Sequence, residues 1–296
     1  MTTALASFNS ALVGIDFSHG SRQALRAAAY LQREGAVQLA MQHVVDSHGI
    51  GELADALSLK QEELVAELQE KGRERMETWS AEAKLESPPT YLSGCGDPTK
   101  ELLETAEEYD LLVLGERGES HPGRGVGTVA VHCVRRAKRR VLLVNQEGEE
   151  VHFDRVVAGI DFSAASSKVL MEAVAMAHLC SASLEVLHVY RAPWDRLHYR
   201  APTAESSPHF RREYLEMLEQ QMRDSLTGID YEPLRTVLHR ASSYGYGIAD
   251  YVRKSHADLV VLGTHGRSTL KELYLGSTAE RLLRELPCSV MTVRTG

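Results

Sequence analysis

The chain has 296 residues, of which 43% are hydrophobic and 25% are charged, and its formal net charge is −8. This composition indicates a globular protein of one large or two ordinary domains, and the acidic charge argues against nucleic acid or an anionic membrane surface as the main partner. No apolar run approaches the roughly 20 residues of a membrane span, and the start MTTALASFNS lacks the features of a secretory signal. We therefore expect a cytoplasmic protein.

Short apolar runs alternate with helical patterns along the whole chain. In the first half we predict strands over residues 11–15, 37–45, 90–93, 111–114 and 141–144. In the second half we predict strands over residues 156–160, 184–189, 235–239, 259–262 and 290–293. This alternation predicts an α/β fold in which each half is a doubly wound, Rossmann-like, mainly parallel sheet of five strands flanked by helices.

The two halves are copies of one sequence unit. The segment VGIDFSHGSRQALRAAAYL, which begins at Val13, matches AGIDFSAASSKVLMEAVAM, which begins at Ala158, and YDLLVLGERG matches ADLVVLGTHG. We therefore expect a tandem repeat with domains at residues 1–147 and 152–296. The polar seam EGEEVHFD is too short for a long flexible linker and should keep the two domains packed together.

One stretch of the second half, ADLVVLGTHGRSTLKELYLGSTAER, joins an apolar strand, a glycine loop and the start of a helix. Gly263 and Gly266 are three residues apart, and nine further residues separate Gly266 from Gly276, Ser277 and Thr278. Glycines let backbone N–H groups approach a ligand, and the free N–H groups of a helix start favour an anion such as phosphate. The simpler alternative is that Ser277 or Thr278 is an N-cap and the glycines are turn residues.

This glycine pattern resembles the nucleotide-binding members of the universal stress protein family, and the flanking LPCSVMTVR resembles the closing strand of that family. The resemblance covers nearly the whole chain. It implies an adenine nucleotide alpha hydrolase-like fold that binds ATP, or ADP or AMP, and it leaves Mg²⁺ open. The site residues that it implies are Asp161, Phe162 and Ser163 at the nucleotide, Val189 beside the adenine, and Gly263, His265, Gly266, Gly276, Ser277 and Thr278 around the phosphates.

The position of Asp161 supports the same interpretation independently. This residue follows the first predicted strand of its half, where a carboxylate can bind a ribose hydroxyl or help to hold Mg²⁺ beside phosphates. The alternative is an acid that the dipole of the following helix favours.

The first copy of the glycine loop departs from the pattern. Gly115 and Gly118 match, but eight rather than nine residues separate Gly118 from Gly127, and one of them, Pro122, lacks a backbone donor. Glu116 also adds a carboxylate, which is unfavourable near phosphate unless a metal intervenes. We therefore expect the main nucleotide site in the second domain and a weakened site in the first.

Two longer segments invite functional interpretations. Residues 46–82 are charged and helical, which favours a packed amphipathic helix over a partner-binding element. Residues 190–212 carry arginines, aromatics and prolines, and are interpreted as a surface crossover or as a lid over the nucleotide.

The resemblance also implies how the two halves assemble. Domains of this family pair through their last strands, so residues 141–144 and 290–293 should join as an internal pseudo-dimer, and exposed edge strands need such a partner. A homodimer and an unidentified protein partner stay open. The basic segment RRAKRR is a weak nucleic-acid signal, because basic residues also complement the dipole at a helix C-terminus.

The function that the resemblance implies is a cytoplasmic stress-response regulator that binds ATP. Two alternatives remain: a slow ATPase, and a protein-interaction scaffold without nucleotide. We assign no catalytic residue, because hydrolysis needs groups that orient water and stabilise the phosphoryl group, and only Asp161 and His265 stand near the loop. The cysteines form no CxxC pair and the histidines no HExxH motif, so neither a disulfide frame nor a transition-metal site is favoured.

Overall fold

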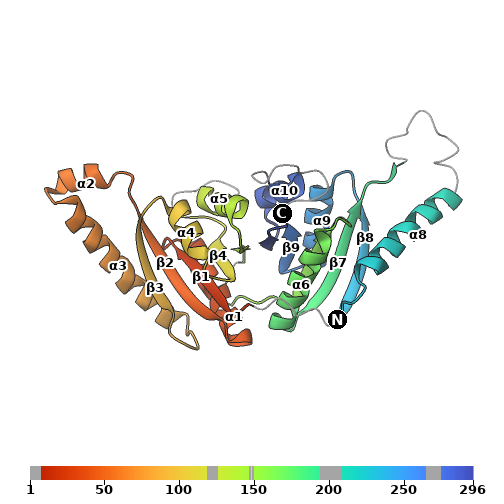
Figure 1. Cartoon of the computed structure of the whole chain (residues 1–296), viewed down its shortest axis with the longest axis horizontal. Coiled ribbons are helices and arrows are strands. Elements are labelled where there is room, and N and C mark those ends of the chain that lie inside the picture. The colour runs from red at the N-terminus through yellow and green to blue at the C-terminus, as the bar shows by residue number, and fades with distance from the viewer. Residues whose placement is uncertain are drawn as a thin grey trace.

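The computed structural model describes residues 8–118, 126–146, 148, 150–193, 208–264 and 275–295. These residues form one sheet of 10 strands with helices along it (Figure 1). The first half of the chain, coloured red to yellow, forms one side of the molecule, and the second half, coloured green to blue, forms the other.

All of the predicted strands are present. Those of the first half are β1 (Ser10–Ile15), β2 (Gln38–Asp46), β3 (Thr90–Gly96), β4 (Leu111–Gly115) and β5 (Arg140–Val144). Those of the second half are β6 (Arg155–Ile160), β7 (Ser183–Tyr190), β8 (Leu234–Arg240), β9 (Leu259–Gly263) and β10 (Ser289–Val293). The central strands are mostly apolar because both faces of the sheet are covered.

Helices connect the strands in both halves. The first half contains α1 (His19–Gly35), α2 (Ile50–Leu57), α3 (Gln61–Glu82), α4 (Pro98–Ala106) and α5 (Thr128–Arg136). The second half contains α6 (Ser166–Cys180), α8 (Pro208–Ser225), α9 (Tyr244–Ser255) and α10 (Ser277–Glu285). None of the described helices is both long and apolar enough to cross a bilayer.

The strand order is β3-β2-β1-β4-β5-β10-β9-β6-β7-β8. Within each half every neighbouring pair is parallel, which confirms the doubly wound, Rossmann-like fold of the sequence prediction. The chain leaves β1 toward β2 and later returns on the other side as β4, and β6, β7 and β9 repeat this path. Ligands of such sheets bind at this switch point, beyond the carboxyl ends of the strands.

The two halves join through their last strands. β5 and β10 pair antiparallel, with Leu142 opposite Met291, so the strand pairing is the one that the sequence analysis expects. Beside these strands, Arg140 Nε donates to Glu172 Oε2 at 2.5 Å, and the two side chains are 17% and 7% exposed. Helices α1 and α6 also contact each other across the junction. Backbone pairing, helix packing and a largely buried ion pair therefore hold the halves together.

Each face of the sheet carries one hydrophobic cluster that runs through both halves. On one face α1, α3 and α6 cover the strands, and on the other face α4, α5, α9 and α10 do so. The outer ends of the molecule are formed by α2 and α3 on one side and by α8 on the other (Figure 1). Residues 46–82 thus contain two helices, of which α3 buries Met76 and Trp79 against the sheet.

Candidate functional site

A cavity of about 540 Å³ opens at the carboxyl ends of β6, β7 and β9. This volume falls within the roughly 300–1,000 Å³ that is typical of small-molecule sites. Eight of the ten residues that the sequence analysis names for the site line this cavity: Asp161, Phe162, Ser163, Val189, Gly263, Gly276, Ser277 and Thr278. The other two, His265 and Gly266, lie outside the described residues.

A strained turn directs Asp161 into the cavity. Directly after it, Phe162 has φ 59°, a left-handed conformation that is unusual for a bulky residue and costs roughly 1–2 kcal/mol. The ring of Phe162 stacks on His188 with centroids 4.0 Å apart, and Nδ1 of His188 bonds to the carbonyl oxygen of Ile160 at 2.9 Å. His188 is therefore a core residue that supports the turn, as its place on an apolar strand predicts.

The carboxylate of Asp161 is itself held in place. Its Oδ1 accepts a hydrogen bond from the backbone N–H of Ser163 at 3.0 Å and another from Oγ of Ser166 at 3.1 Å. Oγ of Ser163 is different, because it is buried and has no hydrogen-bond partner among the described residues. Buried polar groups in native proteins nearly always have a partner. A polar atom of a ligand in the cavity would supply one.

The glycine loop returns to the sheet at the start of α10. The backbone N–H of Gly276 donates to the carbonyl oxygen of Thr264 at 2.9 Å, and the N–H of Thr264 donates to Val293 at the end of β10. Gly276 is the N-cap residue of α10, and no side chain of the described residues caps this helix start. The alternative that Ser277 or Thr278 is the N-cap is therefore wrong, and the first N–H groups of α10 lie at the cavity wall without a side-chain cap from the described residues.

The outer wall of the cavity comes from helices α8 and α9 and from the chain at the end of β7. Helix α8 contributes Tyr214, Met217, Leu218 and Gln221, the start of α9 contributes Tyr244, and the end of β7 contributes Tyr190 and Arg191. The rings of Tyr190 and Tyr214 lie 6.1 Å apart. Most of the 190–212 segment, for which a lid was one alternative, lies outside the described residues.

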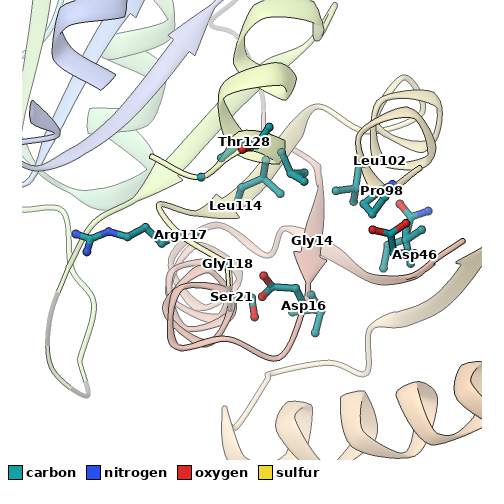
Figure 2. A pocket seen from close by; sticks show the side chains of 17 residues that line it. Gly14, Asp16, Ser21, Asp46, Pro98, Leu102, Leu114, Arg117, Gly118 and Thr128 are labelled. Atoms are coloured by element: carbon teal, nitrogen blue, oxygen red, sulfur yellow. The ribbon is translucent and has the colours of Figure 1, made fainter. Parts of the chain in front are cut away.

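The matching cavity of the first half is smaller, at about 300 Å³ (Figure 2). Its glycine loop lies directly on the start of α1, where Oγ of Ser18 donates to the carbonyl oxygen of Arg117 at 3.2 Å. A Cβ at Gly20 would lie 2.2 Å from that same oxygen, and a Cβ at Gly118 would lie 2.4 Å from Oδ2 of Asp16. The loop can therefore come this close only because both positions are glycine.

The second half has a different residue at the critical position. Ala165 matches Gly20 in the repeat, so the position that contacts the loop in the first half carries a Cβ in the second half. This difference agrees with the larger cavity of the second half. In the first half, Glu116 does not act on the cavity as a lone charge, because its Oε1 pairs with Nη2 of Arg117 at 2.7 Å.

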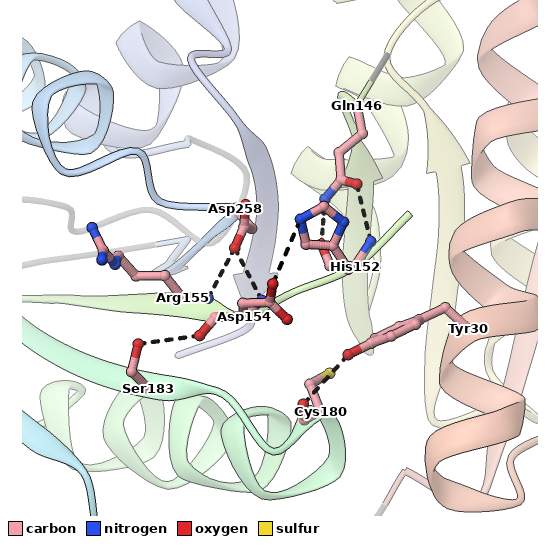
Figure 3. A network of polar contacts seen from close by, with 8 residues as sticks. All are labelled: Tyr30, Gln146, His152, Asp154, Arg155, Cys180, Ser183 and Asp258. Atoms are coloured by element: carbon pink, nitrogen blue, oxygen red, sulfur yellow. Dashed lines mark hydrogen bonds and ion pairs between the residues drawn. The ribbon is translucent and has the colours of Figure 1, made fainter. Parts of the chain in front are cut away.

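A cluster of three polar side chains, His152, Asp154 and Asp258, lies at the junction of the halves, away from both cavities (Figure 3). Oδ2 of Asp258 accepts the backbone N–H groups of Asp154 and Arg155 at 3.0 and 2.9 Å, and Nε2 of His152 lies 3.6 Å from Asp154 Oδ2. Within the described residues, these two carboxylates and the imidazole form the one group whose ligand atoms lie close enough to bind a common metal ion. The carboxylate of Asp258 already binds backbone N–H groups, which makes it an anchor of the linking segment.

The thiols offer no nucleophile at either cavity. Cys95 is exposed, whereas Cys133, Cys180 and Cys288 are buried, and all four are free. Burial raises the pKa of Cys133 and of Cys180 to about 12, and it raises the pKa of Cys288 as well. The thiolate is the reactive form of cysteine, so the buried thiols stay inert at neutral pH.

Comparison with known sequences identifies the family. The sequence model of the universal stress protein family matches residues 7–145 and, a second time, residues 152–294. The chain belongs to the universal stress protein family. The two matches show that it is a tandem universal stress protein, as its internal repeat predicts.

Its relatives carry the same family name. A universal stress protein of Mycolicibacterium smegmatis is 27% identical over 199 residues, which are 65% of this chain and 64% of that protein. Universal stress protein MJ0531 of Methanocaldococcus jannaschii is 40% identical over 47 residues, which are 16% of this chain and 28% of that protein. The matched segments thus span less than two thirds of each of these relatives.

A solved structure shows the same fold over the whole length. The crystal structure of a universal stress protein from Archaeoglobus fulgidus aligns with 98% of this chain and 100% of its own, with a TM-score of 0.65 and 19% sequence identity. The arrangement of two universal stress protein folds in one chain is therefore shared with that protein.

Proposed function

We propose that the second cavity of this universal stress protein binds an adenine nucleotide, with ATP favoured, and that the chain is a cytoplasmic, nucleotide-responsive regulator of a stress response. Within this proposal, the chain consists of two universal stress protein domains, at residues 1–147 and 152–296. The observation that carries it is the start of α10, which has no side-chain cap in the described part of the chain and lines a cavity of about 540 Å³. A helix start of this kind binds phosphate through its N–H groups and its dipole.

Each part of the cavity matches one part of a nucleotide. The backbone at Gly276, Ser277 and Thr278 would hold phosphate oxygens, and the backbone after Val189 would lie beside the base. The walls around the base would be apolar and aromatic, since Tyr190, Met217, Leu218 and Tyr244 line the cavity there. Large apolar walls with a few placed polar groups are typical of small-molecule sites.

Asp161 accounts for the polar centre of the site. It is the one carboxylate among the described residues that line the cavity, and its turn holds it rigidly. It would accept a ribose hydroxyl or hold Mg²⁺, because Mg²⁺ in proteins is bound by one or two carboxylates together with substrate phosphates. In that arrangement the metal would neutralise phosphate charge beside the carboxylate. The hydroxyl of Ser163 in the same turn, which has no hydrogen-bond partner among the described residues, would donate to a phosphate or ribose oxygen.

Identification of the bound ligand tests the proposal directly. Protein purified without added nucleotide is denatured, and the released small molecules are identified by mass spectrometry. Calorimetric titration of ligand-free protein with ATP, ADP and AMP, each with and without Mg²⁺, then ranks the nucleotides. An adenine nucleotide in the first experiment, or submillimolar binding in the second, supports a regulator that senses nucleotide. If neither experiment detects a nucleotide, the scaffold alternative replaces this proposal.

A further inference from the structure

Helix α2, at the outer end of the first half, carries exposed leucines (Figure 1). Leu53 and Leu57 are 44% and 54% exposed, and Leu59, just beyond the helix, is 39% exposed. Within the described residues only three other large hydrophobic side chains are exposed, and each of them lies in the second half. Apolar side chains scattered singly over a surface need no explanation, whereas a cluster with a polar rim is typical of an interaction site.

Helix α2 is nevertheless anchored to the rest of the first half. Ile50 and Ala54 are buried and pack in one cluster with Val45 of β2 and Leu64 of α3. Helical spacing places Leu53 and Leu57 beside Ile50 and Ala54 on a single apolar face. The cluster with α3 therefore covers only part of that face.

The other part of the face stays exposed, and it continues past the end of the helix. The backbone N–H of Leu59 donates to the carbonyl oxygen of Ala54 at 2.9 Å, which holds Leu59 at the helix end. We call the surface of Leu53, Leu57 and Leu59 the α2 face.

The surroundings of the α2 face are acidic. Between residues 50 and 70 the chain carries one lysine, Lys60, and six exposed acidic side chains: Glu52, Asp55, Glu62, Glu63, Glu67 and Glu70. This segment therefore contributes −5 to the net charge of −8. Glu63 pairs with Lys60 and Glu67 pairs with Lys71, whereas the other four carboxylates form no ion pair with the described residues.

This charge distinguishes between the occupants that an apolar surface could have. A second copy of the chain, seated on the same face, would bring two segments of the same sign together, and like charges repel. An anionic membrane surface is disfavoured for the same reason. A protein segment with apolar residues on one side and lysine or arginine at their flanks matches both the leucines and the charge. Because Leu53 and Leu57 lie one helical turn apart, the matching shape is a helix with the same apolar spacing.

We propose that the α2 face docks a basic amphipathic helix of a partner protein. The apolar side of that helix covers Leu53, Leu57 and Leu59, and its basic side chains pair with the surrounding carboxylates. Helix α2 has only eight residues, so the contact is smaller than the roughly 800 Å² per partner of a standard stable interface, and the complex is weak and reversible. This inference does not depend on what either cavity binds.

The test uses two synthetic helices as probes of the full chain. Each has about 18 residues, enough to form a helix in water, with leucines at the spacing of one apolar face; the remaining positions are lysine in one probe and glutamate in the other. Fluorescence anisotropy should show the lysine helix binding at least about 10-fold more tightly than the glutamate helix. Added salt should weaken this binding, because it screens exposed charges. Hydrogen–deuterium exchange should locate the lysine helix through protection of α2 and the first turns of α3.

Two double variants test the residues themselves. Leu53→Gln with Leu57→Gln should weaken binding of the lysine helix about 10-fold or more, because two apolar contacts are lost, and should leave the melting temperature unchanged, because both side chains are exposed. The matched control is Tyr246→Gln, which replaces a side chain that is 47% exposed in the second half and should not change this affinity. Asp55→Lys with Glu62→Lys should remove the preference for the lysine helix.

Several outcomes would overturn the proposal. Equal binding of the two helices, or an unchanged affinity in the leucine double variant, would show that the α2 face does not select a basic apolar partner. Protection at another surface, or no binding of the lysine helix, would do the same. Analytical ultracentrifugation tests the second copy: self-association that the leucine double variant abolishes would assign the α2 face to a homodimer instead.

Discussion

The contact between Gly20 and the first glycine loop makes a sharp prediction. Alanine at position 20 would place its Cβ 2.2 Å from the carbonyl oxygen of Arg117, far inside van der Waals contact. Because the neighbour is a backbone atom, no rotamer change relieves the conflict, and the loop must move away from α1. The hydrogen bond from Ser18 to the same oxygen would be lost with this movement.

The expected cost follows from these contacts. Overpacking of a tight contact costs typically about 1–3 kcal/mol, and a lost hydrogen bond adds roughly 1 kcal/mol. Alanine recovers up to about 1 kcal/mol through its higher helix propensity. We therefore expect Gly20→Ala to lower the free energy of unfolding by about 1–3 kcal/mol, or the melting temperature by about 2–4 °C per kcal/mol. We also expect the first cavity to widen toward that of the second half.

Urea denaturation and calorimetric titration with ATP measure both effects on the same variant. The matched control is Ala165→Gly in the second half, which should not destabilise the chain, because Ala165 is the N-cap residue of α6 and glycine is preferred over alanine at that position. The reasoning is refuted if Gly20→Ala is as stable as the parent and its ATP stoichiometry is unchanged. In that case the close approach of the loop would not be what limits the first cavity.

Four further predictions concern the sites, the junction and the thiols. Gly276→Val should reduce ATP affinity at least 10-fold, which is roughly the loss of one good phosphate contact. The matching change in the first half, Gly127→Val, should leave most ATP binding intact. Equal losses of ATP affinity in calorimetry would show that the first glycine loop also binds phosphate. Phosphate release with ATP and Mg²⁺ should be far slower than the roughly 1–1,000 per second of typical enzymes, and turnover in that range would favour the ATPase alternative. Glu172→Gln should cost about 3–5 kcal/mol in urea denaturation, because it leaves a mostly buried arginine without its partner; a loss below about 1 kcal/mol, typical of an exposed pair, would argue against burial of the pair. Thiol labelling of the folded chain at neutral pH should modify Cys95 alone, and labelling of a buried thiol would reveal local opening at the core.

The strands and the main site residues follow from patterns that the sequence displays directly. Apolar runs that end in Asp161 or Gly263 place those residues at one edge of a parallel sheet, because the carboxyl ends of parallel strands lie together. The pairing of β5 with β10 was expected from the family and from two apolar final strands. These features depend on local periodicity and on the repeat, and both can be read without coordinates.

Other parts of the site depend on long-range geometry. Tyr214 and Met217 reach the cavity only because α8 packs beside β8 at a particular height, which no local pattern specifies. The alternative N-cap, Ser277 or Thr278, lies inside α10, because the helix begins directly after Gly276, a boundary that sequence patterns resolve poorly. Buried amides also escape sequence analysis. Gln42 and the adjacent His43 interrupt an apolar strand, and nothing local distinguishes a surface position from the lining of a cavity.

The unequal cavities follow from how the duplicated chain is stabilised. The hydrophobic clusters and the β5–β10 pairing run through both halves, so neither half relies on its own ligand for a continuous core. Substitutions at a cavity can therefore accumulate in one copy with little effect on the shared sheet. The exchange of one methyl group between Gly20 and Ala165 changes how close a loop can lie, and the exchange between Gln42 and Leu187 changes the polarity of a cavity floor.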